Sequence, residues 1–240
     1  MMKLIAIILI MLVTTLAGLE LVTARLGPSG AAGQAPPMRF DEVVRDDFFA
    51  GFRGDTERLD RGMKRCEEEL AKDPRHAQAL VWHGSGLSFR AGEAARRGDL
   101  VAAGELSQRG HREMNEAVAL APTDVVVLIL RAVTLTAASR GLRDPARARA
   151  ALETAVGDFE STLRIQAPIF KDLPEHPRGE LLGGLADGWY RLGNEERARG
   201  YLTRLAAEIP GSTYADAAQQ WLEHTPLRGG PGLTCMGCHE

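Results

Sequence analysis

The chain has 240 residues, of which 45% are hydrophobic and 25% charged, and its formal net charge is −3. This hydrophobic content excludes a wholly disordered chain, and the charge balance excludes the overall basic surface that attracts nucleic acid. Aromatic residues make up only 5% of the chain. Because strands are rich in aromatic and β-branched residues, this composition favours helices over sheets.

Residues 1–24 have the composition of an export signal. A positive start at Lys3 is followed by an apolar run over residues 4–18, and residues 22–24 suit cleavage by signal peptidase. The run is short for a membrane span and Glu20 interrupts its end, so we expect cleavage. A retained N-terminal anchor is the alternative, and it is then the only membrane attachment. Either way, the rest of the chain is predicted to be periplasmic or otherwise extracytoplasmic.

Residues 25–38 are rich in Gly and Pro and predict a linker, whereas residues 39–224 show helical spacing of apolar residues. The predicted helices cover residues 39–52, a segment ending before Asp73-Pro74, a segment from about Ala77, a long segment from Gly98-Asp99 to about Leu120, residues 124–139, a segment beginning at Asp144-Pro145, and about 178–192, 195–208 and 213–224. Three prolines within residues 167–177 predict a break in the chain. Arg131 and the short length of the apolar 124–139 segment favour a buried helix over a membrane span.

Helices end before a proline at three places, and a new helix begins within a few residues each time: 69–74, 117–122 and 205–210. This pattern resembles the tetratricopeptide repeat family, whose unit is two antiparallel helices in about 34 residues. The best copy ends at Pro210, with small residues at Ala186 and Ala198 for close helix contact and Gly193-Asn194 for the turn. A second copy opens at Ala77, with Gly84 at the close contact.

The resemblance covers roughly residues 55–224, and an irregular helical bundle is the alternative. It implies an all-α fold of tetratricopeptide-like antiparallel helix pairs stacked in a short solenoid, followed by a flexible tail. Because one helix pair cannot bury its apolar side alone, neighbouring pairs complete the core and leave a groove. By analogy, we expect that groove to bind a protein partner or another copy of the chain.

Residues 225–240 form a Gly/Pro-rich tail that ends in Cys235-Met236-Gly237-Cys238-His239-Glu240. Cys-x-x-Cys-His is the attachment signature of c-type cytochromes. The resemblance implies one covalent haem c on Cys235 and Cys238, with His239 as the proximal iron ligand. A redox disulfide and a zinc site are the alternatives. A redox disulfide of the thioredoxin type belongs in a βαβ unit, which this sequence does not predict. A zinc site usually takes a second pair of cysteines, and Cys66 is the only other cysteine in the sequence.

One residue follows His239, so a distal iron ligand has to come from upstream, from another chain, or be absent. His224, at the end of the last predicted helix, is the candidate that we favour. We interpret His83 as structural and His76 and His111 as surface residues.

The sequence therefore predicts an exported monohaem c-type cytochrome that transfers electrons to a redox partner and docks through its helical repeats. No nucleophile–base pair or carboxylate cluster indicates catalysis, so no enzymatic activity is expected. The alternatives are a cell-envelope binding scaffold, for which the terminal motif is a minor metal or redox site, and a haem sensor.

Overall fold

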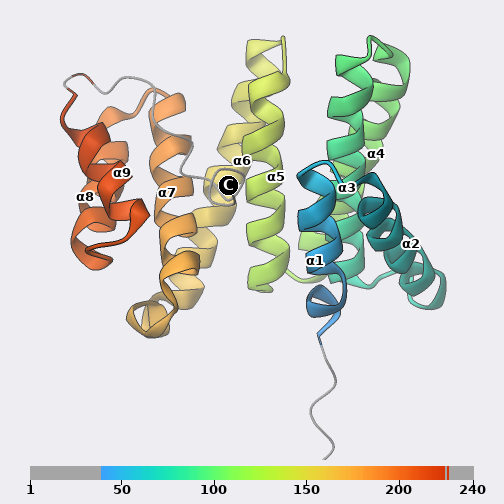
Figure 1. The fold of residues 1–240 in the computed structure, drawn as a ribbon, viewed down its shortest axis with the longest axis horizontal. Coiled ribbons are helices and arrows are strands. Elements are labelled where there is room, and N and C mark those ends of the chain that lie inside the picture. Colours follow the sequence, from blue (N-terminus) through green and yellow to red (C-terminus); the bar gives the residue numbers. More distant parts are fainter. Residues whose placement is uncertain (1–38, 225, 227–240) are drawn as a thin grey trace, which may run out of the picture. The chain divides into compact units, whose positions relative to one another are not determined.

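The computed structural model describes residues 39–224 and 226, and these residues form α-helices and one short 3-10 helix, without a strand (Figure 1). The elements are α1 (Phe40–Phe52), α2 (Thr56–Lys72), α3 (Ala77–Arg96), α4 (Leu100–Leu120), α5 (Val125–Gly141), α6 (Pro145–Gln166), η1 (Ala167–Asp172), α7 (Glu175–Arg191), α8 (Glu195–Glu208) and α9 (Thr213–Leu222). The predicted all-α fold is confirmed. Residues 1–38 lie outside the described part of the chain. The predicted export signal and linker therefore also lie outside it.

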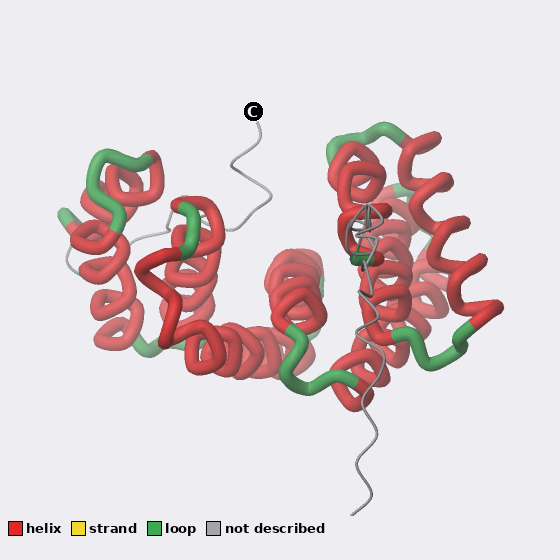
Figure 2. Tube along the Cα trace, turned by 90° about the horizontal axis from the view of Figure 1, so that it is seen from below, coloured by secondary structure: helices red, strands yellow, loops and turns green. Residues whose placement is uncertain are grey.

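Neighbouring helices pack in pairs: α1 with α2, α3 with α4, α5 with α6, and α7 with α8, followed by α9 on α8 (Figures 1 and 2). The first helices of successive pairs also contact one another, from α1 through α3 and α5 to α7. The second helix of a pair contacts the first helix of the next, as α2 does with α3 and α6 with α7. This order of contacts is that of a helical-repeat solenoid, in which each pair buries its apolar side against its neighbours.

Most helices begin at a residue whose side chain accepts a hydrogen bond from a backbone N–H of the first turn. These N-cap residues are Asp55, His76, Asp99, Asp124, Asp144, Asn194 and Ser212. Such caps satisfy donors that the helix itself cannot, which fixes where each helix starts. At the predicted turn between α7 and α8, Gly193 has a φ of +86°, and Asn194 caps α8.

The proline-rich segment 167–177 differs from the predicted break. Residues Ala167–Asp172 continue as a 3-10 helix, and α7 already begins at Glu175, before Pro177. Pro177 occupies the first turn of α7, where its missing N–H is not required by the helix and its fixed φ suits helical geometry. Only the residues around Leu173 and Pro174 interrupt the helical backbone.

Helices α3 and α4 approach each other closely at two glycines. A Cβ on Gly84 would lie 2.7 Å from the carbonyl oxygen of Gly110, and a Cβ on Gly110 would lie 2.6 Å from the carbonyl oxygen of Gly84. Met114 of α4 packs beside Gly84 and is fully buried. The predicted role of Gly84 at a close contact is confirmed. In the last repeat, Ala186 and Ala198 are both fully buried.

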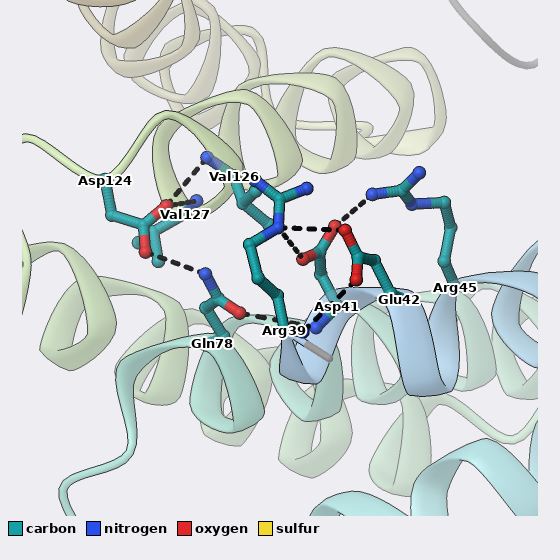
Figure 3. A network of polar contacts seen from close by, with 8 residues as sticks. All are labelled: Arg39, Asp41, Glu42, Arg45, Gln78, Asp124, Val126 and Val127. Atoms are coloured by element: carbon teal, nitrogen blue, oxygen red, sulfur yellow. Dashed lines mark hydrogen bonds and ion pairs between the residues drawn. The ribbon is translucent and has the colours of Figure 1, made fainter. Parts of the chain in front are cut away.

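Polar side chains connect the first helices of three successive pairs (Figure 3). The backbone N–H of Asp41 in α1 donates to Oε1 of Gln78 in α3 at 3.3 Å. Nε2 of Gln78 donates to Oδ2 of Asp124 at 2.9 Å, and Oδ1 of Asp124 accepts from the N–H of Val126 in α5 at 2.9 Å. One glutamine thus bridges α1 and the start of α5, which couples the alignment of three helix pairs.

Asp47 of α1 lies buried against the arginines of α2. Arg61 donates to both of its carboxylate oxygens, at 2.9 and 2.6 Å, and Nε of Arg58 donates to Oδ1 at 3.0 Å. Arg65 adds an ion pair at 3.3 Å. The hydrogen bonds from Arg61 and Arg58 lower the pKa of Asp47 to about 2, against the opposing effect of burial. An ionised carboxylate therefore adds to the apolar packing between the two helices of the first pair.

We expect Gly84→Ala to lower the free energy of unfolding by about 1–2 kcal/mol, because the new Cβ meets the backbone of Gly110, which cannot move without separating the helices. Gly104→Ala in α4 is the matched control, since its Cβ meets no atom within 4 Å. That variant should be stabilised by up to about 1 kcal/mol through helix propensity. Urea denaturation measures both. Equal stability of the two variants would contradict the close contact.

The Asp47 carboxylate should stabilise the fold only while it is ionised. Because its folded pKa is below its unfolded value, its contribution is present at neutral pH and disappears as the pH falls from about 5 to about 2. We expect the free energies of unfolding of wild type and Asp47→Asn to differ by about 1–2 kcal/mol at pH 7 and to converge near pH 2. The difference is smaller than the full pKa shift implies, because the arginines are partly exposed and solvent screens their charges. Denaturation at both pH values measures this, with the exposed neighbour Asp46→Asn as the control. A constant difference across that range would refute it.

Candidate functional site

The three residues of the predicted haem attachment, Cys235, Cys238 and His239, lie outside the described residues. The described chain leads to them through α9 (Thr213–Leu222), which Ser212 caps. Trp221 in the last turn of α9 is 1% exposed, and its ring meets the edge of Tyr190 from α7 at a centroid distance of 5.1 Å. This contact fixes the position from which the tail starts.

Arg199 of α8 binds the backbone at the C-terminal end of α9. Its Nη1 donates to the carbonyl oxygen of Leu222 at 3.4 Å, and its Nη2 donates to that of His224 at 2.5 Å. Its Nε donates to Oε1 of Glu195 at 2.9 Å. The guanidinium thus satisfies carbonyl groups that the helix end leaves without partners. The backbone of His224 is held beside the N-terminal turn of α8, and His224 itself is exposed.

A cleft of about 640 Å³ lies between α6 and the turn that joins α7 to α8. Its apolar lining comes from Val156, Trp189 and Leu192, and its acidic lining from four glutamates. The lining residues are Arg149, Glu153, Val156, Gly157, Glu160, Trp189, Leu192, Gly193, Asn194, Glu195 and Glu196. The volume is in the range of sites that bind small molecules or short peptide segments.

Ion pairs frame this cleft. Arg149 pairs with Glu153 at 2.9 Å within α6, and Arg197 of α8 pairs with Glu160 of α6 at 3.3 Å. The guanidinium of Arg197 also lies over the ring of Trp189, 4.2 Å from its centroid. Glu196 makes no ion pair with any residue in the described part of the chain. One uncompensated carboxylate therefore stands at the start of α8.

The described histidines other than His224 have structural surroundings. His83 is 1% exposed, with Nδ1 2.5 Å from Oε2 of Glu113 and Nε2 3.6 Å from Oε1 of Glu67. The ring of His76 caps α3 by accepting from the N–H of Ala79 at 3.1 Å.

The ring of His176 hydrogen-bonds to the hydroxyl of Tyr214 at 2.9 Å. His111 is partly buried, and both this burial and the charge of Arg147 lower its pKa. His83 keeps the structural interpretation of the sequence, whereas His76 is a helix cap rather than a plain surface residue.

Cys66 is fully buried in α2 and is a free thiol. Burial raises its pKa, and the nearby charges of Glu113 and Glu67 act in the same direction. Because thiolates, not thiols, bind metals, this side chain is a poor ligand. No group of three or more His, Cys, Asp or Glu residues in positions to hold a metal occurs among the residues that the structure describes.

Sequence reasoning missed the cleft and two ion pairs made by buried carboxylates. Arg131 of α5 forms a bidentate pair with Asp158 of α6, with both distances 2.7 Å. Arg140 of α5 reaches Asp187 of α7 at 2.8 Å. From the sequence, Arg131 only argues against a membrane span, and its ion pair with Asp158 is not predicted. The spacing of Arg131 and Asp158 in sequence carries no signal for their contact.

A comparison of the chain with family models, curated proteins and solved structures finds no match. Within residues 39–224, no helix combines the length and apolar character that crossing a bilayer requires.

Proposed function

We propose that this chain is an exported monohaem c-type cytochrome that transfers electrons to a protein partner. The observation that carries the proposal is the sequence Cys235-Met236-Gly237-Cys238-His239. Its donor set, two thiols and one imidazole at fixed spacing, fits a covalently attached haem. A match to this pattern arises by chance in about one in a thousand shuffled chains of this composition, from the frequency product of Cys and His.

Each residue of the motif has one role in this proposal. The thiols of Cys235 and Cys238 hold the porphyrin through thioether bonds, and the imidazole of His239 binds the iron on the proximal side. When bound, haem supplies reversible one-electron chemistry. The protein is then an electron carrier or an electron-transfer subunit rather than an enzyme.

The surroundings of the third cysteine support haem over zinc. A structural zinc site takes four ligands, most of them Cys or His. Cys66 is buried among the helices with a raised pKa, so it is unsuited to supply one of them. The tail then holds two thiols and His239, so a closed zinc site needs a fourth ligand from outside Cys235-Met236-Gly237-Cys238-His239, whereas this motif alone is the complete set for haem attachment.

The helical pairs support a docking role. The helices contact one another in the sequence typical of a repeat solenoid, an architecture that presents extended surfaces to protein partners. The succession of antiparallel helix pairs also resembles tetratricopeptide repeats. We propose that these pairs bind the redox partner or another copy of the chain, outside the inner membrane. The same observation supports the alternative of a cell-envelope scaffold without haem.

The haem is tested directly by expression in a host that carries out c-type maturation. We expect one haem per chain that survives acid–acetone extraction, and loss of haem staining in Cys235→Ser/Cys238→Ser. Cys66→Ser serves as the control. Because the Cys66 thiol is buried, this variant should keep the haem stain unchanged. A zinc-loaded or metal-free product from such a host would overturn the cytochrome proposal in favour of the scaffold.

His224 is the candidate for the distal ligand. If it binds the iron, His224→Ala should convert a low-spin absorption spectrum to a high-spin one. His111→Gln is the control and should leave the spectrum unchanged. A low-spin spectrum that persists in dilute His224→Ala would eliminate this residue, whereas low-spin character lost on dilution of the wild type would indicate a ligand from a second chain.

A further inference from the structure

The C-terminal segment of the chain starts at the rim of the cleft between α6 and the α7–α8 turn. Arg199 holds the carbonyl oxygens of Leu222 and His224 and also pairs with Glu195, which lines the cleft. The chain beyond His224 thus leaves from a point tied to a cleft residue through one side chain.

The length of the segment suits the cleft. A chain extends at most about 3.6 Å per residue, so Arg228 can lie up to roughly 14 Å from His224, and Leu233 up to roughly 32 Å. A cleft of about 640 Å³ accommodates a few side chains of a peptide. The segment is therefore long enough to reach Glu195, because the side chain of Arg199 contacts both this lining residue and the carbonyl oxygen of His224.

The charges of the two surfaces are complementary. Arg228 is the only charged residue between Thr225 and Cys238. The lining contains four glutamates and one arginine, and Glu196 has no ion-pair partner among the described residues. An arginine and a carboxylate without an ion-pair partner can form a charge-assisted hydrogen bond, and Arg228 follows the held carbonyl group of His224 by four residues in the sequence.

Both the cleft lining and the C-terminal segment also contain apolar side chains. Val156, Leu192 and Trp189 form the apolar portion of the lining. The segment contributes Leu233 and Met236, whose burial there would remove apolar surface from water on both sides.

We propose that residues 226–236 of this chain occupy the cleft, with Arg228 paired to Glu196 and the apolar side chains of the segment against Val156, Trp189 and Leu192. The inference goes beyond electron transfer: it assigns the cleft to the chain's own C-terminal segment, which holds the attachment motif beside α6 and α8. It does not require haem. A test on the haem-free full chain therefore separates its failure from a failure of the cytochrome proposal, which haem staining reports.

The test is disulfide trapping in the full chain made without haem attachment. Cys238→Ser leaves Cys235 as the thiol of the tail, and Cys66 is buried and does not compete. Glu153→Cys places a thiol in the cleft lining, and Arg164→Cys is the matched control. Both positions are exposed on α6, and eleven residues place the control on the same side of the helix, about 16 Å further along.

We expect the bond between Cys235 and position 153 to form at least about tenfold faster than that with position 164, as measured by mass spectrometry under non-reducing conditions. Equal rates at the two positions would overturn the proposal, and so would bonds found only between chains, because another copy would then occupy the cleft.

A charge exchange tests the pairing itself. Glu196→Lys in the Glu153→Cys background should abolish the difference in rate, and adding Arg228→Glu should restore it. If Glu196→Lys leaves the trapping rate unchanged, or the second change fails to restore it, the Arg228–Glu196 contact and the placement that depends on it are wrong.

Discussion

The fold depends on how closely α3 and α4, the pair with the most extensive packing, approach each other. Where α3 crosses α4, the backbones are so near that neither Gly84 nor Gly110 has room for a Cβ. This approach allows Met114 and its neighbours to exclude water between the two helices, and the neighbouring helices α2 and α5 then pack against this pair. The polar links are secondary to this constraint, because hydrogen bonds and ion pairs between helices form only at distances that the close packing sets.

Buried charges add specificity to a stack that apolar contacts alone would leave less defined. The pair between Arg131 and Asp158 lies within one helix pair, whereas Arg140 and Asp187 connect the first helices of successive pairs. Burial raises the pKa of Asp158, and the Arg131 guanidinium opposes that effect. An alternative alignment would leave the carboxylates of Asp158 and Asp187 buried without these partners, which is strongly unfavourable. We infer that they select one alignment of α5 against α6 and α7.

Local features of the helical unit could be predicted well from the sequence, and distant contacts could not. Asp144 and Asn194 mark helix starts by chemistry that acts within a few residues, so their positions were predicted correctly. The predicted start of α7 at about residue 178 was too late, because a proline in the first turn of a helix and a proline that ends a helix cannot be told apart from the sequence. The cleft joins residues near Glu153 and Glu196, and only the stacking of separate helices brings these together. The attachment motif is contiguous, which is why the candidate haem residues could be named without the fold.

The burial of Cys66 has a consequence for how the chain matures. In the oxidising compartment that we propose, any exposed third thiol would exchange with the thiols of the tail and produce mispaired disulfides. Cys66 is fully buried in α2 and protonated, so it neither attacks a disulfide nor accepts oxidation while the helices are folded. The fold thereby leaves Cys235 and Cys238 to react with each other or with a cofactor. A helical unit that forms before the tail is modified would protect the chain from its own redox side reactions.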